Sequence, residues 1–401
     1  MNRRRALAFA LAGAASALLA GCFSFSFHRE KPRPGRTAVD SPLVVLPAQK
    51  LGTYLVIEAK WDRAGPWHFI VDTGSTVTHV SPEFAKRYGV KNPGPPTAPD
   101  IRVKSATGET LVLAPVTLHR LELGDAHFDD VPAVVNAASC AQFSAHLGVK
   151  IDGILGFPLF RETLLTLDYP RERILLAPAG STALIPGVVI PFNNANKTPI
   201  IDVRVGERTF IALLDSGSDS ALSINAVGGL SPFFAYGPRE GTIVSTLTGD
   251  HPQQIGRLDE PLAIGSYIIA KPIADLSDEL SAIGGAILEN FAVTFDQEHD
   301  RVTFHRETTA PLPPSPRRSA GIAFAKTPAY WRVVGVVPDS PAAATAVETG
   351  DLVTRINGVA VAHWDFSRYE QLVAHADTIN FTFLHGARET EKTLRVFDLV
   401  P

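Results

Sequence analysis

The chain has 401 residues, of which 45% are hydrophobic and 19% are charged, and its formal net charge is −4. This length is too great for one hydrophobic core, so we expect several domains. The near-balanced charge gives no reason to expect a nucleic-acid partner. Searches for His-Glu-x-x-His, Gly-x-x-x-x-Gly-Lys and Gly-x-Ser-x-Gly find none of them, which disfavours zinc peptidase, P-loop and serine-hydrolase chemistry.

Residues 1–22 have the pattern of an export signal. A basic start at Arg3-Arg4-Arg5 precedes an apolar run, and the stretch ends in Leu19-Ala20-Gly21-Cys22. This end resembles a bacterial lipoprotein cleavage box. The resemblance implies acylation of Cys22, so that the mature chain is a lipid-anchored protein of the bacterial cell envelope, facing the periplasm. An ordinary signal peptide cut nearby is the alternative. We interpret residues 23–44 as a tether.

If Cys22 carries lipid, Cys140 has no partner for an internal disulfide. We interpret Cys140 as a buried core residue, and a reactive thiol is the alternative.

Two similar stretches organise the rest of the chain. Phe69-Ile70-Val71-Asp72-Thr73-Gly74-Ser75 is echoed by Ala212-Leu213-Leu214-Asp215-Ser216-Gly217-Ser218. In each, an apolar strand-like run delivers an aspartate into a tight turn that contains glycine. One such match would favour an ordinary turn, whereas two copies favour a shared function for the two aspartates.

The surroundings of the two motifs repeat in the same order, which indicates a duplicated β-rich unit. The first copy contains Ser105-Ala106-Thr107-Gly108, Leu121-Glu122-Leu123-Gly124, Ile154-Leu155-Gly156, and Leu165-Thr166-Leu167-Asp168 with Arg173. The second contains Thr246-Leu247-Thr248-Gly249, Leu262-Ala263-Ile264-Gly265, Ala282-Ile283-Gly284, and Val293-Thr294-Phe295-Asp296 with Arg301. Equivalent aspartates of a duplicated unit can meet near a pseudo-two-fold axis.

At these residues the chain resembles the pepsin/retropepsin-like aspartic proteases, over about residues 45–305. The resemblance implies an all-β, bilobal double β-barrel with an amino-terminal lobe at 45–180 and a carboxy-terminal lobe at 181–306. It implies that Asp72 and Asp215 are catalytic. The same resemblance makes Thr73 and Ser216 the hydroxyls that brace the two loops, with Gly74 and Gly217 in the turns. Ser75 and Ser218 would donate to the outer carboxylate oxygens.

Two like charges in one site cannot both ionise, so the pair would hold one proton over a wide acid range. Such a dyad activates water against a peptide bond without metal or cofactor, and we expect activity in mild acid on peptide or protein substrates. A bilobal peptide-binding or scaffold protein without catalysis is the alternative function.

The segment 101–113 predicts a hairpin whose turn is Ala106-Thr107-Gly108. In the resembled family a hairpin at this place is the flap that closes over substrate. It lacks the tyrosine of the pepsin branch, and His79 stands where that branch has a tryptophan. A second hairpin around Thr248-Gly249 is its equivalent. The carboxylates Asp152 and Asp168 are predicted to be structural.

Residues 307–320 are rich in proline and predict a stiff, exposed linker. Beyond it, Asp339-Ser340-Pro341 predicts a capped helix start, and the strings of 321–401 closely resemble a bacterial PDZ domain. The resemblance implies that Gly321, Ile322, Ala323 and Phe324 form a carboxylate-binding loop that holds peptide C-termini. A β-rich cap that binds no peptide is the alternative.

Overall fold

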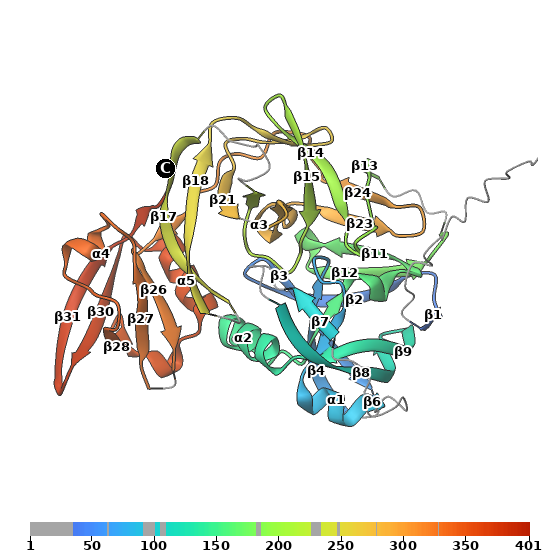
Figure 1. Cartoon of the computed structure of the whole chain (residues 1–401), viewed down its shortest axis with the longest axis horizontal. Helices are drawn as coiled ribbons and strands as arrows, with labels where there is room; N and C mark the ends of the chain where they lie inside the picture. The colour runs from blue at the N-terminus through green and yellow to red at the C-terminus, as the bar shows by residue number, and fades with distance from the viewer. Residues whose placement is uncertain are drawn as a thin grey trace, which may run out of the picture. The chain divides into compact units, whose positions relative to one another are not determined.

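The computed structural model describes residues 35–401, except 62–63, 91–100, 105–109, 182–185, 226–233, 247–248, 278 and 328. Strands make up most of the regular structure, and the helices between them are short (Figure 1). The predicted all-β fold class is therefore confirmed.

The first lobe begins the fold. Its strands are β1 (Arg36–Val39), β2 (Val44–Leu51), β3 (Tyr54–Trp61), β4 (Ala64–Asp72), β5 (Thr78–Val80), β6 (Gly89–Val90), β7 (Ile101–Lys104), β8 (Thr110–Leu123), β9 (Ala126–Val135), β10 (Gly153–Gly156), β11 (Thr163–Asp168) and β12 (Arg173–Pro178). Its helices are α1 (Pro82–Tyr88) and α2 (Ala137–Leu147). Asn136 caps the start of α2 by accepting from Ser139 N, and Gly148 caps its end in the left-handed conformation.

The second lobe repeats this plan. Its strands are β13 (Val188–Pro191), β14 (Ile200–Val205), β15 (Arg208–Leu214), β16 (Leu222–Asn225), β17 (Phe234–Thr246), β18 (Gly249–Leu258), β19 (Leu262–Ile264), β20 (Tyr267–Ile269), β21 (Ile273–Ser277), β22 (Ala282–Ile283), β23 (Ala292–Asp296) and β24 (Arg301–His305), with helix α3 (Gly285–Leu288). Strand β14 alternates as predicted, because Val203 and Val205 are buried while Asp202 and Arg204 are exposed.

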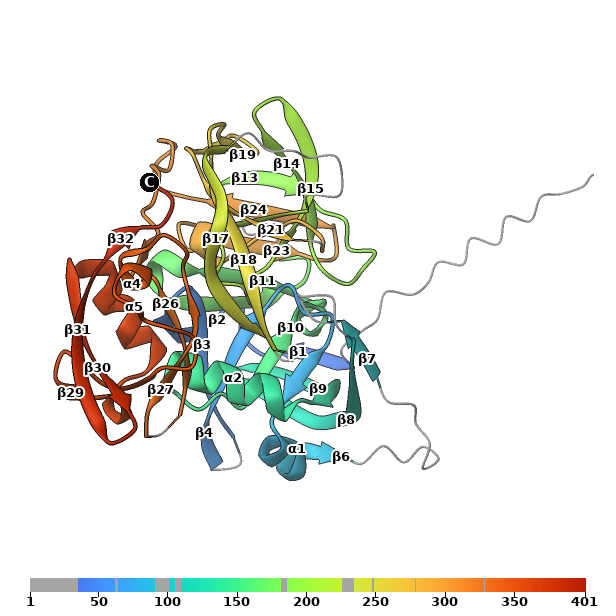
Figure 2. The same cartoon turned by 60° about the vertical axis from the view of Figure 1, so that its left-hand side comes forward.

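The two lobes share one sheet, and equivalent strands of the two repeated units meet at its centre. Strand β11 of the first lobe pairs antiparallel with β23 of the second, and the two strands lie next to each other in Figure 2. Thr166 stands opposite Thr294 in this pairing, and their hydroxyls are 2.8 Å apart. The repeated Asp-Arg pairs flank this centre as ion pairs, Arg173 Nε to Asp168 at 2.8 Å and Arg301 Nη2 to Asp296 at 2.9 Å. Asp168 is thus structural, as predicted.

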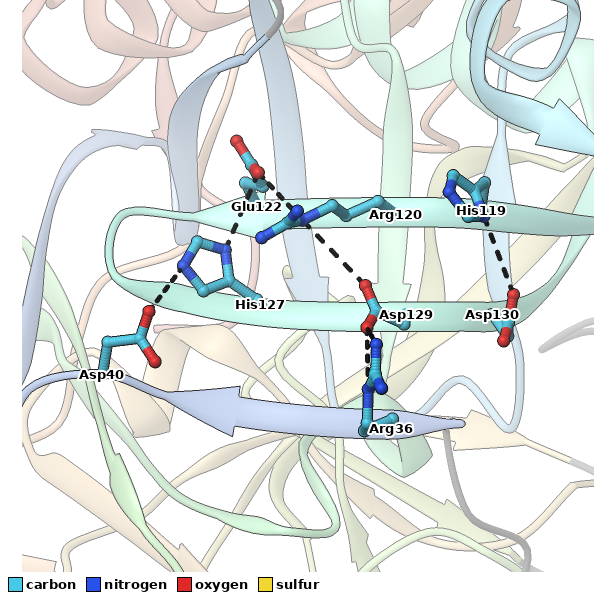
Figure 3. A network of polar contacts seen from close by, with 8 residues as sticks. All are labelled: Arg36, Asp40, His119, Arg120, Glu122, His127, Asp129 and Asp130. Atoms are coloured by element: carbon cyan, nitrogen blue, oxygen red, sulfur yellow. Dashed lines mark hydrogen bonds and ion pairs between the residues drawn. The ribbon is translucent and has the colours of Figure 1, made fainter.

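The predicted tether is too long at its carboxyl end, because Arg36–Val39 forms strand β1. This strand pairs antiparallel with β9 at the edge of the first lobe. Figure 3 shows the charged contacts beside the pairing: Arg36 binds Asp129, and His127 Nε2 lies 3.1 Å from Asp40 Oδ2. The basic and proline-rich composition before residue 36 gave no sign that a pairing edge would follow.

A third β-rich domain follows the lobes and has its own buried core. Its elements are β25 (Arg318–Ser319), β26 (Ile322–Lys326), β27 (Trp331–Val336), α4 (Pro341–Ala344), β28 (Leu352–Ile356), β29 (Val359–Ala360), α5 (Phe366–His375), β30 (Thr378–His385), β31 (Arg388–Arg395) and β32 (Phe397–Asp398). The predicted helix start is confirmed, since Ser340 caps α4 by accepting from Ala343 N and Pro341 is in the first turn.

The prediction of an exposed linker is wrong, because parts of residues 307–320 are bound to the second lobe and to the third domain. Leu312 is buried, donates through its amide to Ile268 O at 2.8 Å and accepts from Ala270 N at 2.9 Å. Further along, Arg318–Ser319 pairs with β32 as strand β25. Proline-rich composition predicts an extended chain, but it does not reveal that the chain adds a strand-like contact to each neighbour.

One buried arginine joins the second lobe, the linker and the end of the chain. The guanidinium of Arg257 donates to Val400 O at 2.7 Å, Lys271 O at 3.0 Å and Ser315 O at 2.9 Å. Beside it, an apolar cluster combines residues from β18 and β21 with residues of the third domain: Ile255, Ile273, Val337, Leu399 and Val400. The third domain is therefore docked on the second lobe.

Candidate active site

Each motif aspartate stands at the end of a strand that a short parallel strand supports. Strand β10 pairs with β4 so that Gly156 is opposite Asp72. In the second lobe β22 pairs with β15 in the same sense, and Asp215 N donates to Ile283 O at 2.9 Å. The repeated apolar-apolar-Gly segments therefore lie directly against the two motif strands, and they hold both loops in equivalent positions.

Main-chain amides of each turn bind the carboxylate of that turn. Asp72 Oδ1 accepts from Gly74 N at 2.8 Å and Ser75 N at 3.1 Å, while Asp215 Oδ1 accepts from Gly217 N at 2.9 Å. These bonds favour the ionised carboxylate and fix its orientation.

The glycines of the two turns bring the loops together. A methyl group on Gly74 would lie 2.5 Å from Asp215 Oδ1, and one on Gly217 would overlap the Asp72 carboxylate. Each glycine therefore packs against the opposite aspartate, and a larger residue at either position would push the two carboxyl groups apart. The sequence-predicted pair is assembled at one place, where the two lobes meet.

The hydroxyls of Thr73 and Ser216 cross from one loop to the other. Thr73 Oγ1 donates to Leu214 O at 2.6 Å and accepts from Ser216 N at 3.0 Å. In return, Ser216 Oγ donates to Val71 O at 2.7 Å and accepts from Thr73 N at 3.0 Å. Both side chains are buried, so this reciprocal set of four hydrogen bonds is shielded from water.

The expectation that the hydroxyls of Ser75 and Ser218 donate to the outer carboxylate oxygens is wrong. Ser75 Oγ donates to Val77 O at 2.7 Å, so it is the Ser75 amide that reaches Asp72. Ser218 Oγ accepts from Ser220 N at 3.2 Å. Each serine therefore shapes its own turn, because a main-chain partner lies within reach of its hydroxyl.

The two carboxyl groups of the pair differ in the shift of their pKa. Burial raises the pKa of Asp72 well above its ordinary value, and the neighbouring charge of Asp215 raises it further. Burial also raises the pKa of Asp215, but the amide of Gly217 and a hydrogen bond from Asp72 lower it. Asp72 is thus the member that keeps a proton, and Asp215 is the member that ionises first.

Two further residues that the sequence did not single out have shifted pKa values: Tyr54 interacts with the charges of the pair, and Asp275 contacts the loop that follows Asp215. Tyr54 is buried, and its pKa is raised well above the ordinary value by burial and by the charges of Asp219 and Asp215. Asp275 on β21 accepts from Ser220 Oγ at 2.8 Å, and burial raises its pKa to about 6. Asp275 has no counterpart in the repeat strings, and Tyr54 reads as an ordinary strand residue, so only the tertiary contacts bring them into view.

Other predicted residues have different outcomes. The hairpin of β7 and β8 is present with Lys104 opposite Thr110, but the flap residues Ala106, Thr107 and Gly108 lie outside the described residues. Cys140 is a free, buried cysteine, and burial raises its pKa to about 12, which supports the core interpretation. Asp152 accepts from His68 N at 3.1 Å and is structural.

In the third domain, Gly321, Ile322, Ala323 and Phe324 lead into and along β26. Gly321 has φ +80° and packs so closely on Ser340 that a side chain would not fit. Its amide donates to Ser319 Oγ at 2.9 Å, so this hydroxyl already occupies the first amide of the predicted loop.

The signal segment and Cys22 lie outside the described residues. Of the described helices, none combines the length and apolarity needed to cross a membrane. In the same described part of the chain, no group of three His, Cys, Asp or Glu side chains is arranged to hold a metal ion.

Comparisons with known proteins agree with part of this description. The family model described as aspartyl protease matches residues 57–159, which include the first motif and β10. No curated protein matches the chain. Among solved structures, a PDZ domain protein from Parabacteroides distasonis ATCC 8503 is similar at 15% identity and a TM-score of 0.19, covering 21% of this chain. The match spans only 20% of that protein. Residues 57–159 are thus similar to aspartyl proteases.

Proposed function

We propose that the protein is an aspartic endopeptidase whose catalytic pair is Asp72 and Asp215. The observation that carries the proposal is the reciprocal brace of Thr73 and Ser216, which holds two half-buried carboxyl groups of unequal pKa against each other. A structural turn has no need of two adjoining carboxyl groups, and a pair whose pKa values are raised unequally is what acid-base chemistry requires.

The chemistry follows from the unequal proton affinities. Ionised Asp215 accepts a proton from a water molecule whose oxygen bonds to the peptide carbonyl carbon, while Asp72 donates its proton to the carbonyl oxygen. When the tetrahedral carbon releases the amine, the C–N bond breaks and the nitrogen takes up the proton held by Asp215. One hydroxyl of the tetrahedral carbon returns its proton to Asp72 as the carbonyl re-forms, so the products are a carboxylic acid and an amine and the dyad again holds one proton.

Replacing Asp72 or Asp215 with Asn tests this proposal, because either change removes half of the shared-proton device. Peptide-library cleavage should fall below detection in both variants. Asp296→Asn is a matched control, since Asp296 is a repeated carboxylate that pairs with Arg301 away from the dyad. Full turnover in Asp72→Asn or Asp215→Asn would refute the assignment, and pepstatin-type binding without any cleavage would favour the non-catalytic peptide-binding alternative.

We further propose that the enzyme is tethered to a membrane of the bacterial envelope through lipid on Cys22, and that the PDZ-like domain recruits peptide C-termini. The motif at residues 19–22 supports the first point. The edge strand β26 with its glycine start supports the second. Labelled fatty acid should be incorporated into the wild type and not into Cys22→Ser. Equal incorporation in both proteins would contradict the anchor.

A further inference from the structure

A turn of the first lobe reaches across to the loop that follows Asp215. Thr53 lies in the turn between β2 and β3, and a methyl group on Gly285 would lie 2.6 Å from its Cβ. Gly285 N donates to Ser218 O at 2.7 Å, so Thr53 packs on a residue that is bonded to the loop of Asp215. The next residue, Tyr54, is buried. Tyr54 therefore lies where the first lobe meets the loop of Asp215.

Helix α2 holds the ring of Tyr54 in place. The centre of the Phe143 ring lies 5.5 Å from that of Tyr54, and the centre of the His146 ring lies 6.1 Å from it, both in an edge-on arrangement. Aromatic rings in this geometry attract each other beyond the burial of their surfaces. The position of Tyr54 beside the second lobe thus depends on the carboxyl end of α2.

The third domain binds the same end of α2 through the start of α5, and Figures 1 and 2 both show the two helices side by side. The His146 ring lies 6.0 Å from that of Phe366, and His146 Nε2 lies 3.9 Å from Glu370 Oε1. Gly148 packs so closely on Asp365 that an added methyl group would lie 2.7 Å from the carboxyl carbon. We call these five residues the α2–α5 contact.

The third domain reaches α2 from a fixed position on the second lobe. Arg257 of β18 donates to Val400 O and to Ser315 O, and Arg239 of β17 donates to Pro338 O at 2.8 Å. Because the third domain is attached to the second lobe in this way, the α2–α5 contact joins the first lobe to the second by a route outside their shared sheet.

The charges that face Glu370 oppose one another. His146 on α2 and Arg317 of the linker attract its carboxylate, whereas Asp219, in the loop after Asp215, and Asp365, at the start of its own helix, repel it. Partial burial raises the pKa of Glu370, the neighbouring His146 lowers it, and Asp219 raises it again. An imidazole carries its proton in mild acid and loses it near neutral pH. The attraction from His146 is then lost while the carboxylates still repel, so both groups weaken the α2–α5 contact as the pH rises.

We propose that His146 is a positioning residue for the catalytic pair, and that its protonation strengthens the α2–α5 contact in mild acid. In that state the third domain supports α2, α2 holds Tyr54, and the turn at Thr53 keeps the loop of Asp215 in place against the first lobe. Near neutral pH this support is lost. The inference rests on the proposed endopeptidase function and adds a regulation to it: the third domain controls the enzyme by pH, whether or not the domain binds a peptide.

Amide hydrogen exchange tests the α2–α5 contact without any substrate. The amides of the first two turns of α5 should exchange about threefold faster at pH 7.5 than at pH 5.5, after correction for the intrinsic pH dependence of exchange. This is the size expected for one half-exposed ion pair. His79, which bonds the α2 cap Asn136, stays neutral throughout, because burial lowers its pKa to about 4.

Glu370→Gln should remove the difference in exchange between the two pH values. The matched control is His375→Gln, which should keep the difference, because this exposed histidine of α5 bonds Gln371 O of its own helix at 2.8 Å. Equal differences in the wild type and in Glu370→Gln would overturn the pH-dependent contact.

Cleavage of a short peptide that spans only the cleft tests the positioning role. The ratio of kcat/KM between the wild type and His146→Gln should be about three at pH 5.5 and about one at pH 7.5, where an imidazole is neutral as well. The same ratio at both pH values would mean that His146 is merely structural, and would overturn the proposal. If the wild type cleaves nothing, the proposed function fails, whereas the exchange experiment still decides whether the contact depends on pH.

Discussion

Replacing Thr73 with Val should measure how much the hydroxyl brace contributes to folding and catalysis. Valine keeps the shape of threonine but leaves Leu214 O and Ser216 N without the partners that they have at 2.6 and 3.0 Å. Thr73 is fully buried, so water cannot replace the lost bonds. Each unpaired buried group costs about 1–3 kcal/mol, so we expect a loss of about 2–6 kcal/mol in the free energy of unfolding.

Urea unfolding with linear extrapolation measures this loss, and an unchanged slope would show that the denatured state is unaltered. Thr73→Ser is the matched control: it keeps the hydroxyl, loses one methyl group and should cost only about 1 kcal/mol. We also expect kcat/KM of Thr73→Val to fall by roughly a hundredfold, since small shifts of the aspartates misplace the attacking water. Equal midpoints for the Val and Ser variants would refute the brace as a source of stability.

Two buried groups outside the dyad predict opposite dependences of stability on pH. Burial lowers the pKa of His79 from 6.5 to about 4, so its contribution is complete above pH 6.5 and is lost as the pH falls towards 4, by about 3 kcal/mol. His79→Asn, which can still accept from Asn136, should remove this acid-side loss in urea titrations between pH 4 and 7; an unchanged slope would contradict it. Burial raises the pKa of Asp275 from 3.8 to about 6, so its contribution is complete below pH 3.8 and is lost as the pH rises through 6, again by about 3 kcal/mol. Asp275→Asn should therefore be more stable than the wild type at pH 7 and indistinguishable from it near pH 4, and a variant no more stable at pH 7 would refute the assignment.

The repeated strings in the sequence predict the centre of the fold well. Thr166 and Thr294 occupy matching places in two similar strings, and a duplicated unit brings such places together at its axis. The resemblance to aspartic proteases implied that Thr73 and Ser216 brace the two loops, and the structure has this contact. These features could be predicted because the strand alternation and the turn glycines agree with the fold that the distant contacts complete.

Other features depend on contacts that no local pattern specifies. Ser75 has both a carboxylate and a main-chain carbonyl within reach, and only the path of the following residues selects Val77 O. Leu312 looks like one apolar residue in a proline-rich linker, and its burial depends on the free edge at β20. Tyr54 interacts with the charges of the dyad, and Asp275 contacts Ser220, only through tertiary packing, so their environments could not be predicted from their neighbours in the sequence.

The β11–β23 pairing makes each half of the protease region an incomplete sheet. A chain ending near residue 180 would expose the whole edge of β11, with its buried leucines and Thr166, to any strand able to pair with it. The symmetric register would let a second copy of the same half take the place of β23, with Thr166 opposite Thr166. An isolated first lobe would then form an isologous dimer in which two copies of Asp72 face each other, or it would aggregate through the same edge.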